Sequence, residues 1–197
     1  MLFIWIKNRI PGRLKREFRR AVQDTWQSPV YRLSNRNAVN GRVRHIVFVC
    51  HGNICRSAFA EHWLRSRLPE KALTIESCGL SVDRSTPPPD QALKASLELG
   101  IDLNSHRSKG FTQCDLKNAD LVLSMEYNHH RRLIAMFPEY RYKIVLLKQF
   151  AGFPRNLACN IHDPYGLDHQ EFQRCFSLMQ ISLQGLIKHF GLSNKHD

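Results

Sequence analysis

The sequence predicts an α/β fold: an open, mostly parallel four-stranded sheet with helices on both faces, preceded by a basic N-terminal extension. Short apolar runs alternate with segments of helical periodicity, which is typical of βαβ units with right-handed crossovers. Charge is also uneven: residues 1–44 carry eleven Lys and Arg against two acidic residues, and residues 45–197 carry eighteen against fifteen. We therefore expect an extension and linker over residues 1–40 and one domain over residues 41–192.

Length and composition exclude several classes of protein. The chain has 197 residues, of which 43% are apolar and 23% charged, values close to globular averages and unlike those of disordered or fibrous chains. No apolar run approaches the roughly 20 residues of a membrane span. The apolar start MLFIWI precedes the first basic residue, which reverses the order of a secretory signal. With six cysteines and no export signal, we expect a cytoplasmic protein with free thiols.

The extension contains a basic amphipathic helix. Its apolar residues fall at helical spacing, its basic residues populate the other side, and we expect it to end before Pro29. A charge run such as residues 13–20 is usually a solvated face. The apolar stretch before it makes membrane-surface or partner docking through residues 1–26 an equal alternative, whereas nucleic acid is not an expected partner. The apolar positions are Leu14, Phe18, Ala21, Val22 and Trp26.

The elements of the domain follow in order along the chain. Residues 35–41 form a linker, and eight elements then alternate between strand and helix. The second helix begins at prolines, which are tolerated in a first turn, and it ends at Gly100. Pro138 ends the third helix. We expect strands at His45–Cys50, Leu73–Cys78, Asp120–Met125 and Lys143–Leu147. We expect helices at Ser57–Leu68 and Pro89–Leu99, a third that follows the Asp120–Met125 strand and runs through Arg131 to Phe137, and a last one at Asp168–His189.

The turn after the first strand has the composition of a phosphate-binding loop. In parallel sheets, ligands bind beyond the carboxyl ends of the strands. Backbone N–H groups and a helix N-terminus can surround a tetrahedral anion there, and an arginine can bind two of its oxygens. The same positive field favours the thiolate of Cys50, the nucleophilic form. Glycine and asparagine tolerate left-handed backbone angles. The loop comprises Cys50, His51, Gly52, Asn53, Ile54, Cys55, Arg56 and Ser57.

The spacing of cysteine, arginine and serine recurs once, from Cys78 to Ser85. Asp83 would place a carboxylate inside this second loop and repel a phosphate. Three prolines at 87–89 prevent a helix from starting directly behind it. We interpret the second match as a chance occurrence.

With these residues in hand, the segment VFVCHGNICRSAFAE resembles the signature of low-molecular-weight protein tyrosine phosphatases, C-x-G-N-x-C-R-S followed by Ala-Glu. The resemblance covers about residues 44–190. It includes a second-strand Ser-x-Gly at Ser77, a Pro-Pro-Asp at 88–90 and an Asp-Pro-Tyr acid loop at Asp163. Two positions depart from the family pattern, with Ala58 in place of proline and Glu126 in place of aspartate. Gly166 is similar to bacterial members.

The resemblance implies a protein tyrosine phosphatase that hydrolyses phosphotyrosine through a cysteinyl-phosphate. Cys50 would be the nucleophile, Arg56 the phosphate clamp and Asp163 the general acid. The remaining loop residues would bind phosphate, with Ser57 donating to the thiolate, Ser77 bracing Asn53, and Tyr165 forming a pocket wall. No metal or cofactor is implied. The implied partner is a phosphotyrosine-containing protein, such as a bacterial tyrosine kinase of polysaccharide synthesis.

Several alternatives stay open at this stage. Thiol-dependent arsenate reductases resemble this chain in fold and in loop, but their reaction needs additional cysteines that relay a disulfide. The sequence has no closely spaced pair of cysteines after the second strand. A non-catalytic module could bind anionic lipid or nucleic acid through the basic extension. Cys55 is either a resolving thiol that forms a disulfide with Cys50 or an inert buried residue. His129 and His130, among arginines, are expected on a solvated helix face rather than at a metal.

Overall fold

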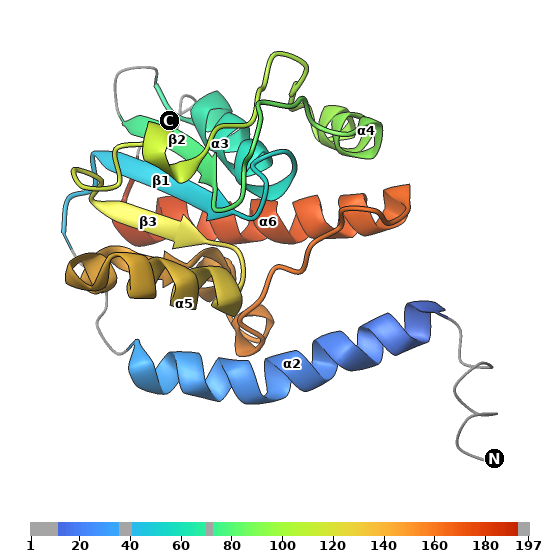
Figure 1. The fold of residues 1–197 in the computed structure, drawn as a ribbon, viewed down its shortest axis with the longest axis horizontal. Coiled ribbons are helices and arrows are strands. Elements are labelled where there is room, and N and C mark those ends of the chain that lie inside the picture. The colour runs from blue at the N-terminus through green and yellow to red at the C-terminus, as the bar shows by residue number, and fades with distance from the viewer. Residues whose placement is uncertain (1–11, 36–40, 70–72, 193–197) are drawn as a thin grey trace.

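The computed structural model describes residues 12–35, 41–69 and 73–192, and its centre is a four-stranded parallel sheet (Figure 1). The strand order is β2-β1-β3-β4, with β1 at His45–Cys50, β2 at Thr74–Gly79, β3 at Leu121–Ser124 and β4 at Ile144–Leu146. The predicted parallel sheet is confirmed, and all of its pairings are parallel. In this register Cys50 lies opposite Gly79, so the loops that follow β1 and β2 leave the sheet side by side.

Helices cover both faces of the sheet, as predicted (Figure 1). Ile46 and Phe48 point into the core shared with α3 (Arg56–Arg67), α4 (Asp90–Glu98) and α6 (His169–Phe190). Val47 and Val49 point to the other face, under α5 (Tyr127–Met136). This alternation is the two-residue period of a strand buried on both sides. Short 3₁₀ turns complete the domain: η1 (Phe111–Gln113), η2 (Pro138–Lys143), η3 (Leu147–Ala151) and η4 (Arg155–Leu157).

The helix of the extension, α2 (Gly12–Ser34), is longer than expected and contains Pro29. The predicted end before Pro29 is therefore wrong. Proline removes one helical hydrogen bond, but residues beyond it are held by the domain. The Tyr31 hydroxyl donates to Gln149 Oε1 at 2.6 Å and accepts from the Leu146 N–H at 3.0 Å. Tyr31 is 5% exposed, which indicates that tertiary packing outweighs the cost of the proline.

The orientation of α2 also differs from the simplest expectation for an amphipathic helix. Its polar side faces the domain, where Arg20 pairs with Glu171 on α6. Its apolar side faces solvent, and Phe18 is 71% exposed. The charge run at 13–20 is therefore only partly solvated. Six large apolar side chains line this outer face, which we call the outer face of α2: Leu14, Phe18, Val22, Trp26, Val30 and Leu33.

His129 and His130 are buried, so their predicted place on a solvated face is wrong. The neighbouring Arg131 and Arg132 are exposed, and the helix turns the two rings inward instead. Burial lowers the pKa of His129 to about 3 and that of His130 to about 4, so both rings are neutral. Within the described residues, no group of three or more His, Cys, Asp and Glu side chains is placed to hold a metal ion.

The contact between α6 and η3 predicts a stability effect at Gly185. A Cβ at Gly185 would lie 1.8 Å from the Phe150 carbonyl oxygen, and backbone cannot move aside as a flexible side chain can. We expect Gly185→Ala to destabilise the fold by about 1–3 kcal/mol, although alanine is the better helix former. Thermal unfolding should show a Tm lower by about 2–4 °C per kcal/mol.

The matched control is Gly12→Ala, because no atom lies within 4 Å of a Cβ at that position. The control should unfold like the wild type. An unchanged Tm for Gly185→Ala would show that α6 and η3 are not packed as described.

Candidate active site

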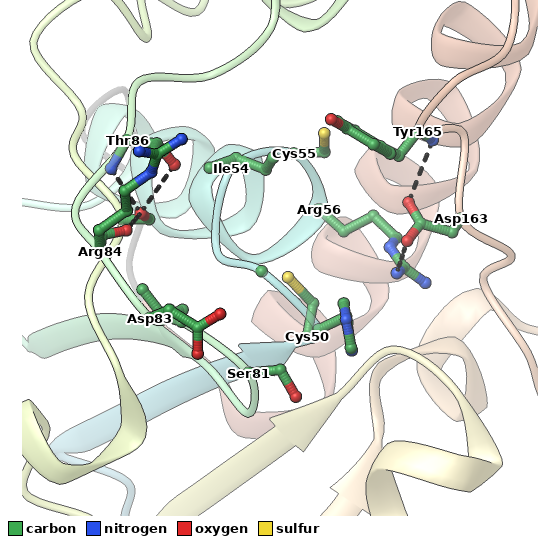
Figure 2. A pocket seen from close by; sticks show the side chains of 14 residues that line it. Cys50, Ile54, Cys55, Arg56, Ser81, Asp83, Arg84, Thr86, Asp163 and Tyr165 are labelled. Carbon is green, nitrogen blue, oxygen red and sulfur yellow. Dashed lines mark hydrogen bonds and ion pairs between the residues drawn. The ribbon is translucent and has the colours of Figure 1, made fainter.

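Cys50 lies at the bottom of a loop between the end of β1 and the start of α3 (Figure 2). The residue is 3% exposed. Its Sγ is 3.0 Å from the Ser57 hydroxyl oxygen, and it accepts from the Asn53 backbone N–H at 3.3 Å. A backbone N–H of the loop and a hydroxyl from the first turn of α3 therefore both lie against this one sulfur.

The buried side chain of Asn53 stabilises the loop through hydrogen bonds. It has a left-handed φ of +53°, as the sequence predicted, whereas Gly52 does not adopt positive φ, so that part of the prediction is wrong. The Asn53 amide Nδ2 donates to Ser57 Oγ at 2.9 Å and to Ser77 Oγ at 2.7 Å. Its Oδ1 accepts from the Lys109 N–H at 2.9 Å. One buried side chain thus links the loop to β2 and to the segment before η1.

Glu61 and Gly79 belong to the motifs that carry the family resemblance, but the sequence assigned them no role, and both support this loop. Ser77 donates in turn to the buried carboxylate of Glu61 on α3, which extends the chain of hydrogen bonds behind the loop. At Gly79, a Cβ would lie 2.7 Å from the His51 carbonyl oxygen and 2.6 Å from Val82 Cγ2. Only glycine fits at this approach. The parallel pairing of β1 and β2 was the available signal, because it sets their carboxyl ends next to each other.

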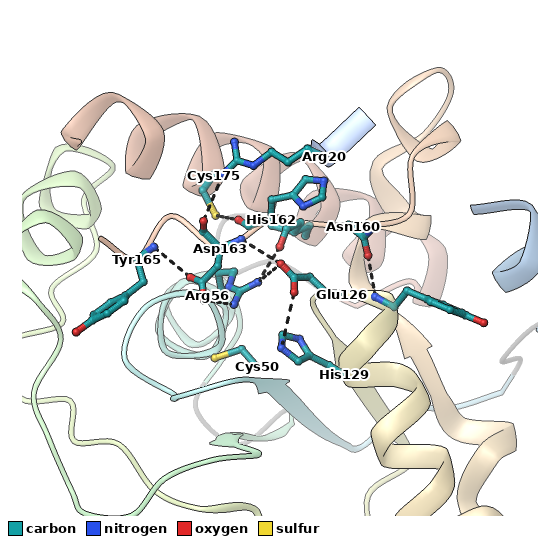
Figure 3. Close-up of polar contacts among 12 residues, drawn as sticks. Arg20, Cys50, Arg56, Glu126, His129, Asn160, His162, Asp163, Tyr165 and Cys175 are labelled. Atoms are coloured by element: carbon teal, nitrogen blue, oxygen red, sulfur yellow. Dashed lines mark hydrogen bonds and ion pairs between the residues drawn. The ribbon is translucent and has the colours of Figure 1, made fainter. Parts of the chain in front are cut away.

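Arg56 is a buried charge with carboxylate and carbonyl partners (Figure 3). Its Nη1 donates to Glu126 Oε1 and to the Ile161 carbonyl oxygen, each at 2.9 Å, and its Nη2 lies 2.6 Å from Asp163 Oδ2. Burial alone would lower the pKa of Arg56, but the carboxylates of Asp163 and Glu126 outweigh it and raise the pKa. The guanidinium is therefore fully charged and fixed in orientation.

Glu126 connects the arginine to the acid loop. The same Oε1 that accepts from Arg56 also accepts from the Asp163 backbone N–H at 3.1 Å. Asp163 Oδ1 in turn accepts from the Tyr165 N–H at 3.2 Å. The sequence marked Glu126 only as a departure from the family pattern. The structure gives it a direct contact with both Arg56 and the acid loop.

A pocket of about 470 Å³ opens above Cys50 (Figure 2). Ile54 and Tyr165 supply apolar lining, and Tyr165 is 61% exposed at the edge. The wall that follows β2 comes from residues 81–84, because the Leu80 N–H donates to the Cys50 carbonyl oxygen at 3.0 Å. The repeated spacing at 78–85 is thus no second phosphate loop, but its interpretation as a chance occurrence missed that it lines the pocket.

The other cysteines differ in their surroundings from Cys50. Cys55 is 3% exposed, and burial raises the pKa of its thiol. Cys78 is buried in β2, and the neighbouring Cys114 thiol and burial raise its pKa. Cys78 is therefore a poor source of thiolate.

The sequence-predicted site residues thus lie together. The loop at 50–57 forms the bottom of the pocket, Asp163 and Tyr165 lie at one side, and Ser77 lies behind the loop as a support. A thiol, a fixed guanidinium and a carboxyl group around one opening can bind a tetrahedral anion and transfer its central atom to sulfur.

Comparison with known proteins agrees with this chemistry. A family model for low molecular weight phosphotyrosine protein phosphatases matches residues 45–195. The protein-tyrosine-phosphatase Wzb of Escherichia coli K12 is 33% identical over 138 residues, which are 70% of this chain and 89% of Wzb. The protein-arginine-phosphatase of Bacillus subtilis is 32% identical over 123 residues, 61% of this chain and 79% of that protein.

A solved structure gives the same result. Wzb from Escherichia coli K30, in complex with sulphate, aligns with a TM-score of 0.68 and 27% identity over 76% of this chain and 99% of Wzb. The helix α2 lies before the residues that the family model matches. From its sequence and its fold, this chain belongs to the low molecular weight phosphotyrosine protein phosphatase family.

Proposed function

We propose that this protein hydrolyses phosphotyrosine in proteins through a cysteinyl-phosphate, with Cys50 as nucleophile, Arg56 as phosphate clamp and Asp163 as general acid. The observation that carries the proposal is the convergence of these three side chains on one pocket. Family membership supports the reaction class. The lining by Ile54 and Tyr165 suits an aromatic ring, and so favours phosphotyrosine over the phosphoarginine implied by the name of the Bacillus relative.

The reaction proceeds in two displacements at phosphorus. The Cys50 thiolate forms an S–P bond as the bond from phosphorus to the phenolic oxygen breaks, and Asp163 gives its proton to that oxygen. Water then attacks phosphorus, passes a proton to Asp163, and displaces the Cys50 sulfur as inorganic phosphate forms. The loop N–H groups and Arg56 stabilise the charge on the equatorial oxygens in both steps.

The contacts of Arg56 divide into two sets with different tasks. Nη1 is held by Glu126 and by the Ile161 carbonyl, which fixes the plane of the guanidinium. Nη2 faces Asp163. When phosphate oxygens occupy the loop, they take the place of the Asp163 carboxylate at Nη2. Once released from the guanidinium, the Asp163 carboxylate takes up a proton from solvent and is then free to turn to the leaving oxygen.

The alternatives that were left open have less support. Arsenate reduction requires a second thiolate that attacks Cys50, and the raised pKa of Cys55 and of Cys78 works against it. A non-catalytic module that binds through the extension would not require a buried Arg56 with a fixed orientation. The resemblance of Gly166 to bacterial members favours a tyrosine kinase of polysaccharide synthesis as the protein substrate.

Six free cysteines favour a cytoplasmic location, and the outer face of α2 favours the surface of an anionic membrane. Side chains from Leu14 to Leu33 on this face are between 42% and 71% exposed, and exposed arginines accompany them on the same helix. The apolar side chains could enter the bilayer, and the arginines could contact negatively charged lipid headgroups. No helix among the described residues is long and apolar enough to span a membrane, so binding would be at the surface.

The nucleophile is tested by Cys50→Ser and Arg56→Lys. We expect each change to lower kcat/KM for para-nitrophenyl phosphate at least about 1000-fold and 100-fold, respectively, because a hydroxyl is not activated here and lysine loses the bidentate contact. A melting curve close to that of the wild type shows that each variant is folded. Activity above a few per cent in either folded variant would contradict the mechanism.

The general acid is tested by leaving-group dependence. Asp163→Asn should slow phenyl phosphate about 100-fold or more, but para-nitrophenyl phosphate less than about 10-fold, because nitrophenolate leaves without a proton. The matched control is Asp83→Asn, an exposed carboxylate that lines the same pocket. This control should affect both substrates alike and weakly. Equal losses for Asp163→Asn on the two substrates would exclude it as the acid.

Membrane docking is tested by sedimentation with vesicles. Wild-type protein should bind phosphatidylglycerol vesicles and bind phosphatidylcholine vesicles weakly. The double variant Phe18→Ser, Val22→Ser should lose at least about tenfold in affinity, because burial of each apolar side chain contributes roughly 1.5–3 kcal/mol. Leu97→Ser, at a 63% exposed residue of α4, is the control and should bind normally. Unchanged binding of the double variant would remove the outer face as the docking surface.

A further inference from the structure

The segment that carries the proposed general acid has no regular structure of its own. Residues 159–163, here called the acid segment, lie between η4 and α6 and belong to no helix or strand. Backbone polar groups in such a segment need partners from elsewhere in the protein. On one side the domain supplies them: the Asp163 N–H donates to Glu126, and the Ile161 N–H donates to the Met125 carbonyl at 2.8 Å.

The polar side of α2 supplies partners on the other side, with Arg20 seen beside the segment in Figure 3. Asp24 accepts from Asn160 Nδ2 at 2.8 Å through Oδ1 and lies 3.0 Å from His162 Nε2 through Oδ2. Ser28 Oγ accepts from the Cys159 N–H at 3.0 Å. Arg20 Nη2 donates to the carbonyl oxygen of Asp163 itself at 3.3 Å.

These contacts form an ordered series. The α2 residues 20, 24, 27 and 28 fall on one face of the helix, at spacings of three and four residues. They meet the acid segment in reverse order, since Ser28 meets its first residue and Arg20 meets its last. Gln27 completes the series by accepting from Asn160 Nδ2 at 2.8 Å. The helix therefore contacts each residue of the segment except Ile161, which Met125 and Arg56 of the domain bind.

Two charged side chains, Arg20 at one end and Asp24 in the middle, strengthen this series. Arg20 Nη1 pairs with Glu171 Oε2 at 2.8 Å, so one guanidinium joins the first turn of α6 to the Asp163 carbonyl. Burial would raise the pKa of Asp24, but the hydrogen bond and charge of His162 outweigh it and lower the pKa. Asp24 is therefore a carboxylate, able to accept from Asn160 and His162 together.

We propose that Arg20 and Asp24 are positioning residues for catalysis: they hold the acid segment so that the Asp163 carboxyl group meets the leaving oxygen above Cys50. The proposal rests on the proposed role of Asp163 as general acid. The contacts described reach the acid segment and not the loop at 50–57. Ile161, whose carbonyl accepts from Arg56, is bound by Met125 of the domain and not by these α2 residues. Loss of the α2 contacts should therefore impair proton donation while phosphate binding and attack by Cys50 continue. The extension is thereby part of the catalytic apparatus, although it lies outside the matched family domain.

The test uses Asp24→Ala and Arg20→Gln in the full chain, each measured with phenyl phosphate and para-nitrophenyl phosphate. We expect kcat/KM for phenyl phosphate to fall about 10–50-fold, because a small displacement of a catalytic group is costly, and that for para-nitrophenyl phosphate to fall less than about 3-fold. Inhibition by inorganic phosphate should stay unchanged. Arg19→Gln, an exposed neighbour on the same helix, is the matched control and should behave as wild type.

The decisive comparison repeats both changes in an Asp163→Asn background. Residues that act through Asp163 should then add less than about 3-fold to the loss on phenyl phosphate, since coupled residues are not additive. Equal losses on both substrates, or undiminished losses in the Asp163→Asn background, would overturn the proposal and assign α2 a structural role. If Asp24→Ala does not fold, the isosteric Asp24→Asn and Arg20→Gln carry the same comparison.

The two levels of failure are distinguishable. If Asp163→Asn alone slows both substrates equally, Asp163 is not the general acid, and the positioning proposal is wrong together with it. If Asp163→Asn discriminates between the substrates but the Arg20 and Asp24 variants do not, only the positioning proposal is wrong.

Discussion

The structure around the pocket depends on one buried cation. Arg56 is 1% exposed, and a guanidinium at that depth requires paired charge and hydrogen-bond acceptors, which, among the described residues, its Nη1 and Nη2 have and its Nε lacks. Glu126 from the end of β3 and Asp163 from the acid segment supply the charge, and the Ile161 carbonyl supplies a further acceptor. Two parts of the chain that are distant in sequence, the residues that follow β3 and the acid segment, are thereby drawn to the loop after β1. The pocket is a consequence of how this charge is compensated.

Much of this arrangement could be predicted from the sequence, and for a physical reason. The burial of each strand and helix in the domain is visible in the periodicity of its own apolar residues. The predicted positions of these elements were therefore correct to within a few residues. The loop at 50–57 is local, and its spacing alone places a thiol and an arginine around one anion. The left-handed backbone at Asn53 followed from residue type. These features need no knowledge of which element packs against which.

The wrong predictions concern features that depend on contacts between elements distant along the chain. Periodicity shows which side of α2 is apolar, but only the polar acid segment decides that the other side packs inward. Burial of His129 and His130, the close approach at Gly79 and the pocket wall at residues 81–84 all arise from neighbours that are remote along the chain. The continuation of α2 past Pro29 has the same origin, because the buried Tyr31 ties its last turns to the domain.

The inverted orientation of α2 has a consequence for its response to salt. Its inner contacts are ion pairs and hydrogen bonds of half-buried groups, such as those of Arg20 and Asp24, and screening weakens such contacts. Its outer face is apolar, and strongly hydrated salts such as sulfate strengthen the association of apolar surfaces. Raising the concentration of such a salt therefore weakens the contacts between α2 and the domain. At the same time, it strengthens the association of the outer face of α2 with other apolar surfaces.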